Sequence, residues 1–77
     1  MRINYDKKSD AMYIRFSEEK YYESDEVKEG VILDFDKKGK IIGVEVLDVS
    51  ERLPKESMSS IHFEVEPVMA KKALKNK

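Results

Sequence analysis

The single histidine of this 77-residue chain, His62, is the first side chain to consider for acid–base chemistry. It lies between Ile61 and Phe63 on the polar phase of an alternating stretch, where a solvated imidazole is expected. Catalysis would need a carboxylate or a nucleophile held beside the imidazole, and no motif supplies one. We therefore predict no catalytic residue.

Carboxylates are numerous, but their pattern does not indicate an active site or a metal site. Acid–base work by two carboxylates requires a cleft that separates their pKa values, and a chain this short has no room for a deep one. The run Asp36-Lys37-Lys38-Gly39 lacks the other acidic positions of a calcium loop, and a polar turn explains it better. Three isolated glycines form no phosphate loop, and there is no cysteine. We predict neither a metal nor a cofactor.

Two acidic residues, Glu45 and Asp48, have no obvious structural role in the sequence. With Tyr13, they mark the first place to look for a specific surface. They also define the alternative reading: a small-ligand-binding protein or an enzyme, with an acidic site built from Glu45, Asp48 and His62 at a subunit junction.

The distribution of charge disfavours nucleic acid as a partner. Residues 67–77 carry four lysines and no acidic residue, so the other eleven of the 15 basic side chains share residues 1–66 with all 16 acidic ones, a net charge of −5. Nucleic-acid-binding domains usually show a basic face on the folded body itself. Binding through the lysine tail would be weak and would depend steeply on salt.

Length and composition favour a small cytoplasmic protein that associates with a second copy. No apolar run of about 18 residues and no signal-peptide core follows Met1, so no membrane partner is expected. A chain of 77 residues makes one domain near the lower size limit for a stable core, and no disulfide can supplement it. Docking into a homodimer is the expected source of further burial.

Alternating apolar residues predict a mainly β domain over residues 1–66. We expect an antiparallel meander of five to six strands, with a short helical turn near 50–58 that Ser50 would start. The strands are expected near residues 2–6, 11–16, 21–28, 31–36, 41–49 and 61–65. The segment 41–49 is apolar on both faces and should be central, whereas the charged 21–28 should lie at an edge. Residues 67–77 form a basic tail, either frayed or a short C-terminal helix.

A motif repeated thirty residues apart predicts two β-hairpins. Tyr5-Asp6-Lys7-Lys8 and Phe35-Asp36-Lys37-Lys38 each precede a polar corner and then an alternating apolar stretch. Gly43 lies inside the second of these stretches. A glycine within a strand usually marks a bulge or a close approach, here by an aromatic side chain of a neighbouring strand or by a partner subunit.

Surface tyrosines indicate contact with protein rather than with nucleic-acid bases. The neighbours of Tyr21 and Tyr22 include Glu18, Glu19 and Glu23, whereas a base-stacking platform would interleave aromatics with basic residues. The predicted interaction surface comprises Tyr13, Tyr21, Tyr22, Ile41, Gly43, Glu45, Leu47 and Asp48.

The blocks YDKKSDAMYIRFS and EGVILDFDKKGKIIGVEVLDVSERL resemble the domain of unknown function 2283, a family of small bacterial and archaeal proteins. The resemblance spans residues 4–53 and departs at Val49, where such sequences often carry alanine. It implies a compact, mostly β domain without an established activity, and an antitoxin-like role beside a small toxin for some members. We therefore expect a non-enzymatic interaction module that self-associates, with a small toxin-like protein as a further partner.

Overall fold

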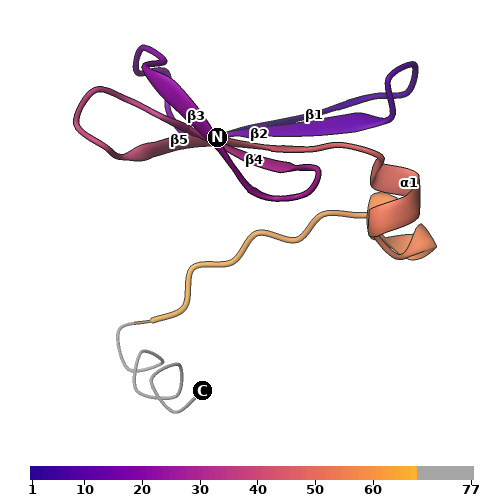
Figure 1. Ribbon diagram of the computed structural model, residues 1–77. Helices are drawn as coiled ribbons and strands as arrows, with labels where there is room; N and C mark the ends of the chain where they lie inside the picture. Colours follow the sequence, from indigo (N-terminus) through magenta and orange to yellow (C-terminus); the bar gives the residue numbers. More distant parts are fainter. Residues whose placement is uncertain (68–77) are drawn as a thin grey trace.

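One antiparallel β-sheet of five strands forms the body of the protein in the computed structural model, which describes residues 1–67 (Figure 1). The strands are β1 (Arg2–Asp6), β2 (Ala11–Arg15), β3 (Glu23–Lys28), β4 (Val31–Phe35) and β5 (Ile41–Val46). A four-residue helix, α1 (Val49–Arg52), and a 3-10 turn, η1 (Lys55–Met58), follow the last strand. The predicted mainly β fold with a short helical turn near residues 50–58 is confirmed.

The repeated aromatic-Asp-Lys-Lys motif folds in the same way in both hairpins. At the end of β1, Oδ1 of Asp6 accepts a 2.9 Å hydrogen bond from the backbone N–H of Lys8. At the end of β4, Oδ1 of Asp36 accepts 2.9 Å hydrogen bonds from the backbone N–H groups of Lys38 and Lys40. An aspartate that accepts from the backbone two residues on forms an Asx turn, which reverses the chain. The motif therefore encodes the corner of each hairpin.

Strand β5 lies in the middle of the sheet, as its two apolar faces predicted. The strand order is β1-β2-β5-β4-β3, and β5 pairs antiparallel with both β2 and β4. The order differs from a continuous meander at one point, because the chain crosses from β2 to the opposite edge before it returns through β4. The exposed and charged β3 occupies that edge, as predicted.

The start of α1 is held by a residue of the first hairpin, which corrects the expectation that Ser50 starts the helix. The N-cap position is Asp48, whose φ of 51° is left-handed and whose side chain makes no capping bond. The cap comes from Asp10, whose carboxylate accepts a 3.2 Å hydrogen bond from the Ser50 N–H and a 2.7 Å bond from its hydroxyl. The carbonyl of Asp10 accepts a 3.0 Å bond from the N–H of Val49. Local sequence does not reveal a cap supplied from forty residues away.

Few side chains are fully enclosed in this fold. Among residues 1–67, the buried apolar side chains are Ile42 and Val49, each 1% exposed. Every residue of β2 and of β4 is only half-buried. Figure 1 shows α1 on one side of the sheet, at the end beside the β1–β2 hairpin. Residues 1–67 therefore provide no second layer over most of the sheet.

The sixth strand expected over residues 61–65 is not formed. Residues 60–67 have no regular secondary structure, and the alternating side chains Ile61, Phe63 and Val65 are 68%, 72% and 81% exposed. Alternation supplies the side-chain pattern of a strand, but a strand also needs a neighbour for its backbone hydrogen bonds, and none of the five described strands pairs with this segment. The expected C-terminal helix falls on residues 68–77, outside the described part of the chain, so the division at residue 67 stays a prediction.

Candidate functional site

The two faces of the sheet differ in their chemistry. One face, here called the apolar face, carries two cross-strand rows, which are Ile3, Ile14, Val44 and Leu33, and Tyr5, Met12, Val46 and Val31. The opposite face, here called the polar face, carries the rows Arg2, Arg15, Gly43, Asp34 and Ser24, and Asn4, Tyr13, Glu45, Ile32 and Glu26. Because partners in antiparallel register point to the same side of a sheet, each row lies on one face. Both faces are candidates for a functional surface.

The apolar face carries a hollow of about 280 Å³ beside the segment that follows β5. The sheet contributes Ile3, Tyr5 and Met12 to its wall, and the later segment contributes Leu53, Ser57, Met58 and Ile61. Ile3 and Phe16 remain 42% and 40% exposed. Apolar surface that is contiguous over a sheet face marks a contact with another molecule more often than isolated apolar residues do.

On the polar face, the ring of Tyr13 lies over Gly43. A Cβ atom on Gly43 would lie 2.7 Å from Cζ of Tyr13 and 3.2 Å from the carbonyl oxygen of Ile14, so a side chain there would displace the ring. Of the two explanations that the sequence left open for this glycine, the structure shows the aromatic neighbour. A ring that covers a glycine on the next strand restores packing that the glycine lacks.

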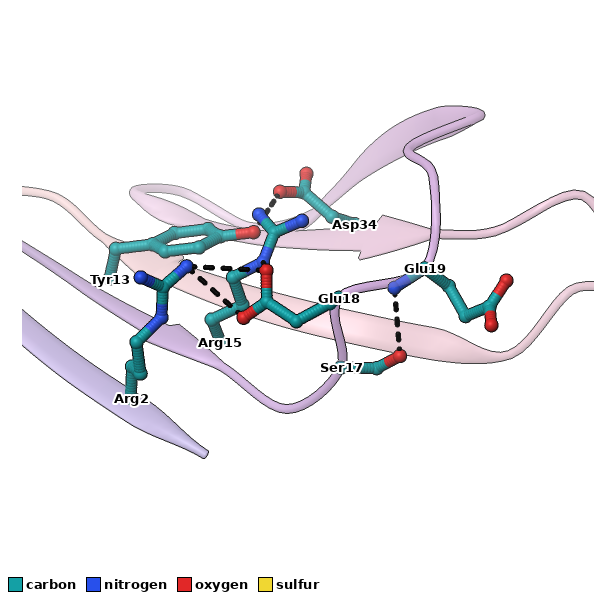
Figure 2. A network of polar contacts seen from close by, with 7 residues as sticks. All are labelled: Arg2, Tyr13, Arg15, Ser17, Glu18, Glu19 and Asp34. Atoms are coloured by element: carbon teal, nitrogen blue, oxygen red, sulfur yellow. Dashed lines mark hydrogen bonds and ion pairs between the residues drawn. The ribbon is translucent and has the colours of Figure 1, made fainter.

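Tyr13 also leads a chain of hydrogen bonds toward the β3 edge. Its hydroxyl donates a 2.8 Å bond to Oδ2 of Asp34 (Figure 2). Ser24 donates a 2.7 Å bond to Oδ1 of the same carboxylate, and a 3.0 Å bond joins the hydroxyls of Ser24 and Tyr21. Burial raises the pKa of Tyr13, the bond to Asp34 and its negative charge raise it further, and Arg15 opposes them. The network keeps the Tyr13 phenol protonated and fixes its ring.

Two arginines flank Glu18 at the β1 side of the polar face (Figure 2). The Glu18 carboxylate lies 3.1 Å from the guanidinium of Arg2 and 3.4 Å from Nε of Arg15. The side chains of Arg2 and Glu18 are 70% and 71% exposed, so water screens this ion pair and it adds little stability. Nε of Arg15 is buried without a hydrogen-bond partner among the residues that the structure describes.

A second polar cluster joins the first hairpin to α1. The Tyr5 hydroxyl donates a 2.6 Å hydrogen bond to Oδ1 of Asp10, which also accepts the bonds from Ser50. The bond from Tyr5 and then the bonds from Ser50 hold the pKa of Asp10 below its usual value, although desolvation opposes them. The same contact raises the pKa of Tyr5. Both carboxylate oxygens accept hydrogen bonds from the protein, so Asp10 acts as a clamp.

The sheet and the start of α1 coincide with a region of the chain that matches a known protein family. The family described as "Protein of unknown function (DUF2283)" matches residues 2–50, which include all five strands and the first residues of α1. The chain belongs to the DUF2283 family. No curated protein and no solved structure matches it significantly. The resemblance seen in the sequence is confirmed, and both the Tyr13 network and the Asp10 clamp lie within the matched region.

In this DUF2283 domain, part of the predicted interaction surface gathers on the polar face. Tyr13, Gly43 and Glu45 lie on the two strands β2 and β5, and Tyr21 joins them through Ser24. Glu45 is half-buried opposite Tyr13, and its side chain forms no hydrogen bond to any residue of 1–67. These residues are therefore neighbours, as the prediction of one surface requires.

The other predicted surface residues are distributed around this group. Tyr22 and Ile41 are 56% and 46% exposed. Leu47 and Asp48 build the joint between β5 and α1, because the N–H of Leu47 donates a 2.8 Å bond to the carbonyl of Gly30 and the carbonyl of Asp48 accepts from Arg52 at 3.1 Å. The role that the sequence left open for Asp48 is thus to take a left-handed turn before the helix.

One copy of the DUF2283 domain does not bring the alternative acidic site together. His62 lines a hollow with Met1, Ile3, Ile61 and Phe63, whereas Glu45 lies on the polar face and Asp48 at the start of α1. Over residues 1–67, no group of three or more His, Asp or Glu side chains is placed to hold a metal ion. No helix within the same range has the length and apolar character needed to cross a membrane.

Sequence reasoning missed Asp34 and Ser24 as partners of Tyr13. One signal was available, since Asp34 is the only charged residue within the otherwise apolar strand VILDF. Its place opposite Gly43, however, depends on the register of β4 with β5, and the approach of Tyr13 depends on the pairing of β2 with β5. The distant pairing of β2 with β5 has no local signature, so the network appears only once the strand order is known.

Proposed function

We propose that the protein is a non-enzymatic interaction module that self-associates through the apolar face of its sheet. The observation that carries this proposal is the thin core, in which Ile42 and Val49 are the buried apolar side chains among residues 1–67. A sheet with one apolar face is stable when that face is covered by a second layer. In this chain α1 and η1 cover only one end of it. A second copy offers an identical apolar face, as a two-fold dimer requires.

The polar face is the less suitable surface for self-association. The hydroxyl of Tyr13 and both oxygens of Asp34 already have partners within the chain. Covering Arg15 and Glu45 would remove two charged groups from water, which is unfavourable unless the partner supplies matching groups. The surface around Tyr13 remains a proposed site for a different partner with complementary charge.

Two substitutions in adjacent positions of β1 separate the two faces. Ile3 lies on the apolar face and is 42% exposed, so Ile3→Asp should leave the monomer folded and abolish the dimer. Asn4→Asp introduces the same side chain on the polar face and should leave the dimer intact. Sedimentation equilibrium measures the mass, and circular dichroism checks the fold. Equal dimerisation by both variants would contradict the assignment to the apolar face.

A small toxin-like protein is the second partner that we propose, and this part rests on the antitoxin-like role that the resemblance implies for some members of the family, not on geometry. We place it on the same apolar face, where it would compete with the second copy. A pulldown with the product of the adjacent gene tests the role. Retention that Ile3→Asp abolishes would support it, and absence of retention by the wild-type chain would count against it.

A further inference from the structure

The segment after η1 carries a strand pattern that its own sheet does not use. We call residues 60–66 the arm; its apolar side chains are Ile61, Phe63 and Val65, and all three are more than two-thirds exposed. Figure 1 shows the arm leaving η1 and running along the α1 side of the sheet without joining a strand, and residues 61–63 line a hollow with Met1 and Ile3. Strict alternation of this kind is the pattern of a strand with one buried face.

We propose that the arm of each copy pairs with the edge of β1 in a second copy and forms a sixth strand there. The inference rests on the self-association proposed above and names what the second copy contributes. Strands β1 and β3 are the two edges of the sheet, and an edge presents unpaired backbone N–H and C=O groups. An added strand satisfies these groups, as in other cases of β-strand addition. In this register its apolar side chains extend the apolar face beside Ile3 and Tyr5.

Charge selects the β1 edge over the β3 edge. The polar phase of the arm consists of His62, Glu64 and Glu66. Strand β3, with the sequence ESDEVK, would oppose these glutamates with its own acidic residues, and like charges on adjacent strands are destabilising. The polar phase of β1 consists instead of Arg2, Asn4 and Asp6, and the side chain of Arg2, which lies 3.1 Å from Glu18, is 70% exposed. A glutamate of the arm opposite Arg2 gains a favourable pair.

The arm also raises the area buried between the two copies to that of a stable interface. Five strands about 4.8 Å apart and about six residues long at about 3.4 Å per residue give a face of about 24 by 20 Å. Two such faces stacked together bury about 1,000 Å², which is less than the roughly 1,200 Å² at which standard interfaces begin. Three exposed apolar side chains per arm, on the order of 100 Å² each, raise the total to about 1,600 Å².

The path of the chain favours exchange between copies over pairing within one copy. Ile61 lines a hollow with Ile3, Tyr5 and Met12, and residues 61–63 line a second one with Met1 and Ile3, so the arm begins over the apolar face of its own sheet, against β1 but not paired with it. To pair with its own β1, the arm would have to leave these hollows and turn from the face into the plane of the sheet. The edge of a facing copy requires no such turn.

Cysteine pairing tests the exchange directly, because the chain has no cysteine of its own. Ile3→Cys and Phe63→Cys are made in separate chains of different mass, mixed, and oxidised under mild conditions. The proposal predicts a covalent heterodimer as the main product, since the exchange places Phe63 of one copy beside Ile3 of the other and each chain carries a single cysteine. A mixture without the heterodimer would overturn the arm exchange. Ile3→Cys mixed with Asn4→Cys is the matched control and should give little heterodimer.

A second pair of variants keeps the inference separate from the proposed self-association. Phe63→Asn removes an apolar anchor of the arm, and His62→Asn changes the adjacent residue of the polar phase. Sedimentation equilibrium should show a dissociation constant raised about tenfold or more by Phe63→Asn and nearly unchanged by His62→Asn. A dimer of unaltered affinity in Phe63→Asn would overturn the role of the arm and leave the stacked faces standing. A monomeric wild-type chain would overturn both.

Discussion

The phenol ring of Tyr13 covers Gly43 on the neighbouring strand, and the Tyr13 hydroxyl reaches over it to Asp34 on the strand beyond. This contact ties together three neighbouring strands of the sheet, β2, β5 and β4. It also fixes the polar face, since the same carboxylate holds Ser24 on β3. Side-chain hydrogen bonds therefore link the strands on the polar side of the sheet, whereas much of the apolar side lacks cover among residues 1–67.

Substitution of Gly43 by alanine should destabilise the protein, because a Cβ atom would overlap the Tyr13 ring. Overpacking of this kind typically costs about 1–3 kcal/mol of unfolding free energy. Chemical denaturation measures the change. In a Tyr13→Ala background the ring is absent, so the same substitution should cost much less. An equal cost in both backgrounds would show that the ring does not set the requirement for glycine.

The stability supplied by Asp10 should be lost in acid. Its hydrogen bonds from Tyr5 and Ser50 lower its pKa below the ordinary value of 3.8, so the folded state binds this proton more weakly than the unfolded state does. The contribution is complete above 3.8 and disappears as the pH falls through the lower folded pKa. The difference in unfolding free energy between wild type and Asp10→Asn should therefore be larger near neutral pH than in acid. A difference that does not change with pH would contradict the clamp.

The stability supplied by Tyr13 should be lost at alkaline pH, whereas that supplied by Asp10 is lost in acid. Burial and the contact with Asp34 raise its pKa above 10.0, so the folded state holds the phenol proton more tightly than the unfolded state does. The stability that follows is present below 10.0 and is lost as the pH rises through the folded pKa. Selective NMR labelling of tyrosine follows the titration. Asp34→Asn should move the pKa of Tyr13 downward, and an unchanged titration would exclude the coupling.

The two aspartates of the repeated motif should contribute unequally. Asp36 is 8% exposed and accepts two backbone hydrogen bonds, whereas Asp6 is exposed and accepts one. Replacing Asp36 with alanine removes the acceptor of the Lys38 and Lys40 N–H groups, two hydrogen bonds worth about 0.5–1.5 kcal/mol each, so we expect a loss of about 1–3 kcal/mol. Asp6→Ala, the matched change in the first hairpin, should cost less than about 1 kcal/mol. Thermal and urea unfolding compare them, and equal losses would contradict this reading.

The features of this structure that depend on residues close together in the chain could be predicted from the sequence. The Asp-Lys-Lys corners, the acidic edge strand and the central position of 41–49 were all predicted from turn chemistry and alternation, because each depends on residues close together in the chain. The pairing of β2 with β5 and the cap that Asp10 gives to α1 were not predicted, since both join segments about thirty or forty residues apart.

The sixth strand that the sequence predicts over residues 61–65 is not formed for a different reason. The pattern of Ile61, Phe63 and Val65 is that of a strand, but the hydrogen bonds of a strand come from its neighbour, and none of the five strands within residues 1–67 provides them. Of the predicted surface residues, Gly43 and Glu45 lie on one face because side chains two residues apart on a strand share a face. Tyr13 lies on the same face because it is opposite Glu45 on β2. It did not distinguish Leu47 and Asp48, whose roles lie in their backbone geometry.

Solvent access to the methyl groups of Leu33 and Val44 tests the central claim most directly. Both lie on the apolar face, which a second copy is proposed to cover. With a soluble paramagnetic probe, their NMR signals at high protein concentration should be as well protected as those of Ile42, which is 1% exposed, and should lose protection on dilution. Broadening at every concentration to the level of Val27, which is 52% exposed, would show that the apolar face stays open to water and would contradict the account.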